Sequence, residues 1–194
     1  MKTQTRQLGI FAALVLLMTV TRGSHFGSAI HLPDATLAIF LIAGYMLPRY
    51  TWTALAAFTL LLMEAGGLDY YAIVYRNVSD YCVSPAYWFL IPTYASMWFA
   101  GHWFAARQQN NFNSLALFGG VSWISTSIAF LISNGAFYTL SGKFTDMNIA
   151  EYAARVAKYY PSYASGALMY LAIAAVVYSV IFRMNKASTG AAQQ

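Results

Sequence analysis

The sequence predicts an all-α integral membrane protein with six transmembrane helices, and three observations support this. Hydrophobic residues make up 59% of the 194 residues, and charged residues only 9%. A soluble domain has about 25% charged residues, so this chain could not cover a water-facing surface and needs lipid as its main solvent. The apolar residues gather into six segments, and the basic residues lie singly between them. Six spans would use about 120 residues, which suits one domain of this length.

The six helices are expected at the apolar segments, with predicted bounds 8–20, 35–47, 52–65, 87–106, 115–134 and 164–182. The last three are long enough to cross a hydrocarbon core of about 30 Å. The first three are short, so they need flanking polar residues to complete a span, or they pack mainly against other helices. Gly66 and Gly67 are typical of a helix C-terminus and favour an end to the third helix there.

The distribution of charge predicts that both termini lie inside the cell. Six basic residues fall on the side of the termini, in short tails and tight turns, where the positive-inside rule applies best. Five basic residues and all six acids fall on the other side. Segment 8–20 could also be a signal peptide, but no small-x-small cleavage signal follows it, so a retained helix is preferred.

The outer connections, predicted at 21–34, 66–86 and 135–163, are long, whereas the inner turns are short. Long loops in a compact domain are usually functional, so these three could form a lid over a ligand. The third contains a predicted short helix at 149–160. Asn148 is suited to cap this helix, with Glu151 reaching back as in a capping box.

Cys82, the one cysteine, lies in the second outer connection. A free cysteine is often a small buried hydrophobe, but a thiolate in a loop is also a soft ligand for a transition metal. His31 lies in the first outer connection, just before Asp34, which could be the N-cap of the second helix. The chain has no His-x-x-x-His or Cys-x-x-Cys spacing. We therefore expect no metal held by the protein alone; a metal would arrive inside a cofactor.

Two further polar residues could contact a ligand. Asp69 is either a solvated loop acid or an acceptor for amide N–H groups of a ligand. Arg155 either forms a surface pair with Glu151 four residues earlier or donates to a phosphate or amide oxygen. The outer half is also rich in tyrosine, including Tyr87. These rings could form an interfacial belt or contact a large, flat, amphipathic ligand.

The segment YCVSPAY at 81–87, together with six helices, short inner turns and long outer loops, resembles the BtuM family. These are small solitary S-components of the ECF transporter type, proposed to carry cobalamin. The resemblance covers most of the chain and implies an S-component-like bundle in the bacterial inner membrane, with a cobalamin site under the outer loops, facing the periplasm. By resemblance, Cys82 is the axial ligand of the corrin cobalt and could also remove cyanide from cyanocobalamin. The other pocket residues that the resemblance implies are His31, Asp69, Tyr87 and Arg155.

The energy source and rival functions remain open at this point. The sequence has no P-loop, so the chain cannot hydrolyse ATP itself. Transport driven by ATP would therefore need a separate ECF module of ATPase and coupling subunit, and the sequence leaves open whether such a module is used. Gly9 and Ala13 form a small-xxx-small pair that could be its docking surface. The alternatives are an S-component for another vitamin, a small membrane enzyme that uses the Cys82 thiol, and a membrane assembly factor without a small ligand.

Overall fold

The computed structural model describes residues 2–24, 32–47, 51–81, 83–109, 111–144 and 148–191. Over these ranges the chain is helical apart from turns and short connections, which confirms the predicted all-α class. The elements in chain order are α1 (Lys2–Ser24), α2 (Thr36–Met46), α3 (Thr51–Arg76), the 3₁₀ helix η1 (Pro85–Phe89), α4 (Leu90–Ala105), α5 (Phe112–Leu140) and α6 (Ile149–Ala191).

Three of the described helices are long and apolar enough to cross a membrane. Their candidate spans are Trp52–Arg76 in α3, Asn113–Leu140 in α5 and Ile149–Val180 in α6. Large apolar side chains on these helices are exposed, for example Leu60, Ile124 and Val176. Exposed apolar surface of this extent suits lipid rather than water, so the helices are those of a membrane protein.

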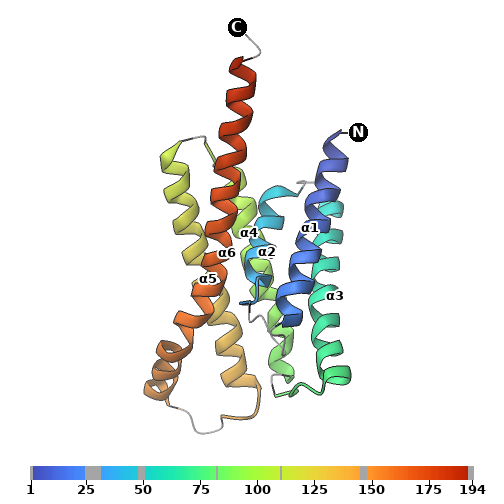
Figure 1. Ribbon diagram of the computed structural model, residues 1–194. Helices are drawn as coiled ribbons and strands as arrows, with labels where there is room; N and C mark the ends of the chain where they lie inside the picture. The colour runs from blue at the N-terminus through green and yellow to red at the C-terminus, as the bar shows by residue number, and fades with distance from the viewer. Residues whose placement is uncertain are drawn as a thin grey trace.

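The helices run alternately up and down, and both termini lie at the same end of the bundle (Figure 1). Helices α1 and α3 pack side by side, as do α5 and α6, with α2 and α4 between the two pairs. We call the end that holds the α3–η1 and α5–α6 connections the connection end, and the opposite end the terminus end.

Helix α2 is the centre of the core. Eight of its 11 residues are buried, including Ile39, Phe40 and Leu41. The Phe40 ring stacks on Tyr94 of α4, with ring centroids 4.6 Å apart. A helix that is apolar on all sides is expected to be buried, so α2 follows the prediction that a short segment packs mainly against other helices.

Helices α2 and α4 approach so closely that their backbones touch at two glycines. A Cβ atom added to Gly101 would lie 2.0 Å from the Leu41 carbonyl oxygen, and one added to Gly44 would lie 2.1 Å from the Trp98 carbonyl oxygen. Small residues allow this kind of approach between membrane helices. The two glycines therefore set the distance between α2 and α4.

The predicted end of the third helix at Gly66 and Gly67 is wrong, because α3 continues to Arg76. A glycine inside a helix costs about 1 kcal/mol relative to alanine, and here the helix continues through both. The chain turns instead at Asn77, which has a φ of 52°. The connection to η1 is therefore much shorter than the predicted 66–86.

The predicted capping box at the start of α6 is confirmed. The Glu151 N–H donates to Asn148 Oδ1 at 2.9 Å, and the Asn148 N–H donates to Glu151 Oε2 at 3.3 Å. The predicted separation of a 149–160 helix from a 164–182 helix is wrong, because α6 runs through both with Pro161 inside it. Proline removes one helical hydrogen bond and usually bends the helix, and α6 bends in its first part (Figure 1). The predicted outer connection 135–163 is correspondingly short, since α5 extends to Leu140.

Candidate functional site

A buried arginine joins α1 to α3 toward the connection end. Arg22 lies near the end of α1, and its side chain is 9% exposed. Its Nε donates to Asp69 Oδ1 at 2.7 Å, and its Nη2 donates to Asp69 Oδ2 at 2.6 Å. Two parallel bonds between a guanidinium and a carboxylate are the strongest form of this pair. Asp69 is thus bound in a fixed orientation inside the protein.

The other side of the same guanidinium contacts α2 and α4. Arg22 Nη1 lies 3.2 Å from Asp34 Oδ2, 3.1 Å from Thr36 Oγ1 and 3.1 Å from the Tyr94 hydroxyl. Asp34 Oδ1 in turn accepts from the Thr36 N–H at 2.9 Å. Asp34 therefore satisfies an N–H at the start of α2, as an N-cap would, although the helix begins two residues after it.

Tyr87 brings η1 to this cluster. Its hydroxyl donates to Asp69 Oδ2 at 2.6 Å. Pro85 begins η1, where the fixed φ of proline fits the first turn of a helix. We call Arg22, Asp34, Thr36, Asp69, Tyr87 and Tyr94 the Arg22 network.

The Arg22 network has one positive and two negative side chains, so it carries a net charge of −1 when all three are ionised. Removing one partner of a buried ion pair leaves an uncompensated charge and typically costs 3–5 kcal/mol. The network therefore fixes the relative positions of α1, α2, α3, α4 and η1. Through Tyr87 and Asp69 it also holds η1, and with it the segment that leads into η1, against α3.

Two of the predicted pocket residues, Asp69 and Tyr87, are in direct contact in this network. Arg155 lies elsewhere: its guanidinium carbon is 4.9 Å from the Phe144 ring centroid and 5.6 Å from that of Tyr138. Arg22 forms ion pairs with Asp34 and Asp69, whereas the expected pair of Arg155 with Glu151, both of them described residues, is not among the ion pairs of the structure. Cys82 and His31 lie outside the described residues.

The residues on each side of Cys82 are held at the connection end. Lys143 Nζ donates to the Tyr81 carbonyl oxygen at 2.7 Å and lies 3.4 Å from the centroid of its ring. The Tyr81 ring also lies 5.9 Å from Phe137 of α5. On the other side, the Val83 N–H donates to the Asp80 carbonyl oxygen at 2.7 Å, and η1 packs against α5.

Sequence reasoning missed Arg22, which it counted only as a charge in the first outer connection. A signal was present, since Leu14 and Met18, both buried, precede Arg22 at intervals of four residues. This is the spacing of one helix face. Extending α1 by a single turn would have placed the arginine on the buried face, where it needs a carboxylate partner.

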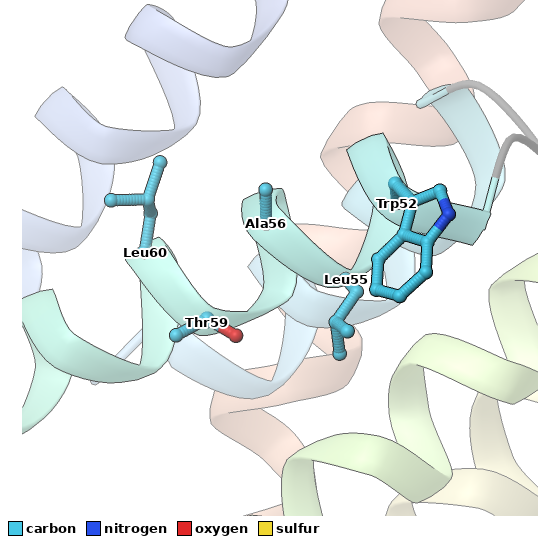
Figure 2. A pocket seen from close by; sticks show the side chains of 5 residues that line it. All are labelled: Trp52, Leu55, Ala56, Thr59 and Leu60. Atoms are coloured by element: carbon cyan, nitrogen blue, oxygen red, sulfur yellow. The ribbon is translucent and has the colours of Figure 1, made fainter.

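A shallow hollow of about 440 Å³ lies on α3, outside the Arg22 network. It is lined by Trp52, Leu55, Ala56, Thr59 and Leu60. All five side chains come from one helix, and Figure 2 shows them along α3. Leu60 is nine residues before Asp69, about 13 Å along the helix, so the hollow is separate from the Arg22 network. Because its lining is mostly apolar and comes from α3 alone, the hollow is part of the outer surface of that helix.

Metal-ligating side chains do not cluster in the described part of the chain, where no group of three or more His, Cys, Asp or Glu residues could hold an ion. No protein-family model matches the sequence, and no curated protein matches it significantly.

Proposed function

We propose that this protein carries cobalamin across a bacterial inner membrane, with all six helices within the bilayer and both termini inside the cell. The connection end then faces the periplasm and receives the ligand. Support for this orientation comes from basic residues: Arg6 and Arg107 lie toward the terminus end, one in the short N-terminal part and one in the tight turn between α4 and α5. This arrangement agrees with the positive-inside rule.

One observation favours the proposal most: the chain on either side of Cys82 is anchored. Tyr81 is bound by Lys143, and Tyr87 is bound by Asp69. A short segment held at both ends costs little further entropy when a ligand binds. A thiolate in such a segment is suited to replace an axial ligand of the corrin cobalt, and cobalt accepts soft sulfur ligands.

The other predicted pocket residues take more specific roles in this proposal. Asp69 and Tyr87 support the cysteine-bearing segment from below, because the Asp69 carboxylate is already occupied by Arg22. Tyr81 is half exposed and offers a flat ring to the corrin. His31 and Arg155 remain proposed contacts at the edge of the site.

A docking surface for an ECF coupling module is proposed on α1. Gly9 and Ala13 both lie on an exposed face of this helix, and a Cβ atom added to Gly9 would meet no atom within 4 Å. A partner helix could approach this face closely.

The test is a visible absorption spectrum of the full chain, purified in detergent after exposure to aquocobalamin. The wild type should retain the corrin and show a shifted spectrum, because a cobalt–sulfur bond changes the electronic transitions of the metal. Cys82→Ala should lose the shift. Val83→Ala, a change in the same exposed segment, is the matched control and should keep it.

Two outcomes would contradict this proposal. A colourless wild type would remove the cobalamin assignment. A bound corrin with the same spectrum in the wild type and in Cys82→Ala would remove the cobalt–thiolate bond. Binding of a different vitamin that is indifferent to Cys82 would favour the alternative S-component function.

A further inference from the structure

A carboxyl group lies at the centre of a membrane span and takes no part in the Arg22 network. Glu64 is midway along the candidate span Trp52–Arg76 of α3. Its Oε1 is 2.9 Å from Thr19 Oγ1 of α1. Its Oε2 is buried and has no hydrogen-bond partner among the described residues. Ionisable groups inside a membrane are costly, so they usually have a function or a compensating partner.

The hydrogen atoms available at this contact indicate which group is the donor. Thr19 Oγ1 also lies 3.0 Å from the Val15 carbonyl oxygen, one turn earlier in α1. A hydroxyl has one hydrogen, and an ionised Glu64 would leave two acceptors competing for it. With a proton on Glu64, Thr19 donates to Val15 while Glu64 donates to Thr19, and both contacts become hydrogen bonds.

The surrounding charges do not stabilise an ionised Glu64. Arg22, one turn beyond Thr19 on α1, directs its guanidinium to Asp69, Asp34, Thr36 and Tyr94. The carboxylates of its network already outnumber it by two to one. An ionised Glu64 would add a further negative charge, with a single hydroxyl as its donor.

The remaining titratable side chains on the elements packed against α3 do not change this balance. Lys2 and Arg6 belong to the first turns of α1, and Arg6, the nearer of the two, is about 20 Å along the helix from Thr19. Tyr45 lies near the end of α2, and its hydroxyl bonds to Gln108. None of these residues supplies a cation to Glu64.

We propose that Glu64 is a proton-binding site within the membrane and that at neutral pH it holds its proton and donates it in a hydrogen bond to Thr19. The ligand of this site is a proton, exchanged at the contact between α1 and α3. The proposal does not depend on the identity of the transported molecule. Because Glu64 lies on α3 and Thr19 on α1, loss or uptake of this proton would change the contact between the two helices. Their relative movement could thereby be coupled to proton binding.

The first test uses dicyclohexylcarbodiimide, a lipid-soluble reagent that reacts with protonated carboxyl groups. A carboxyl oxygen bonds to the central carbon of the reagent while the carboxyl proton moves to a reagent nitrogen, so the adduct keeps all atoms of both molecules. The full chain in lipid vesicles is treated at neutral and at alkaline pH, and its peptides are measured by mass spectrometry. We expect labelling of Glu64 at neutral pH that falls at alkaline pH.

Asp80 and Glu151, which are exposed acids of the same chain, serve as internal controls and should stay unlabelled. A Glu64→Gln variant should lose the label and, because Gln has the shape of a protonated Glu, should purify like the wild type. Labelling of Asp80 and Glu151 to the same extent as Glu64 would overturn the proposal, as would a Glu64 that stays unlabelled.

Two further measurements do not depend on access of the reagent. The infrared carbonyl stretch of a protonated carboxylic acid should be present in the wild type at neutral pH and absent from Glu64→Gln. In Thr19→Val, the pH at which this band disappears should fall, because Thr19 stabilises the protonated form. A rise in that pH would show that Thr19 donates to an ionised carboxylate, and either this rise or a missing band would refute the proposal.

Discussion

The Arg22 guanidinium lies between two carboxylates and touches side chains from three other elements, so its loss cannot be repaired locally. We expect Arg22→Leu to lower the free energy of unfolding by about 3–5 kcal/mol, because the buried Asp69 and the partly exposed Asp34 would both lose their cation. Unfolding of the purified chain in detergent, followed by tryptophan fluorescence with rising denaturant, measures this change.

The matched control is Arg155→Leu. Arg155 is half-buried and contacts two aromatic rings, and a contact of this type contributes about 0.5–2 kcal/mol. Equal losses in the two variants would contradict a special role for the Arg22 network.

Tyr87 donates to a carboxylate that is already bound to Arg22. Tyr87→Phe keeps the ring and removes the hydroxyl, so we expect a loss of about 1.5–3 kcal/mol, the range for hydrogen bonds to charged groups. The same denaturant titration measures it. Tyr71→Phe is the control, because Tyr71 is exposed on α3, and an equal loss there would count against the Asp69 contact.

At this scale the sequence indicated the residue types of the site but not their partners. Asp69 and Tyr87 were predicted as polar pocket residues because the family resemblance implies them. The contact of Asp69 with Arg22 joins residues 47 positions apart, and that of Tyr87 with Asp69 joins residues 18 positions apart. No local sequence pattern predicts such pairings. Asp69 was predicted as either a solvated loop acid or a ligand acceptor. It is buried within α3, so it is not a solvated loop acid, and its carboxylate binds Arg22 and Tyr87.

Among the elements, the contact of α2 with α4 offers the sharpest test. Gly101→Ala would push a methyl group into the Leu41 carbonyl oxygen, and overpacking of this kind costs about 1–3 kcal/mol or more. Gly67→Ala in α3 meets no atom within 4 Å and should stabilise the helix by up to about 1 kcal/mol. Thermal unfolding in detergent should therefore show opposite shifts, and a neutral Gly101→Ala would contradict the close approach.

The element boundaries show that apolar runs predict helices well, and that glycine and proline predict the ends of helices poorly in a membrane protein. The segments 35–47 and 87–106 match α2 and the region of η1 and α4 closely, because apolar runs mark buried helices. The glycines at 66 and 67 and the proline at 161 would often end a helix in water. In hydrocarbon, an interrupted helix would leave backbone N–H and C=O groups without partners, so α3 and α6 continue through them.

For the whole molecule, the proposed orientation predicts which end is accessible from outside the cell. In a Cys82→Ala background, Asp80→Cys should react with a membrane-impermeant maleimide in intact spheroplasts. Arg6→Cys should react only after lysis, because both residues are exposed but lie at opposite ends of the bundle. Labelling of both variants in intact spheroplasts would contradict a terminus end that faces the cytoplasm.

The short α2 also constrains how the protein is made. Its 11 residues form a helix about 17 Å long, little more than half of a hydrocarbon core of about 30 Å. Such a helix is a poor independent stop for the translocation machinery, and its most extensive partner, α4, is synthesised later. In the proposed arrangement with all six helices in the bilayer, stable insertion of α2 therefore has to wait until α4 has emerged from the ribosome. A nascent chain truncated before residue 90 should then leave α2 outside the bilayer core.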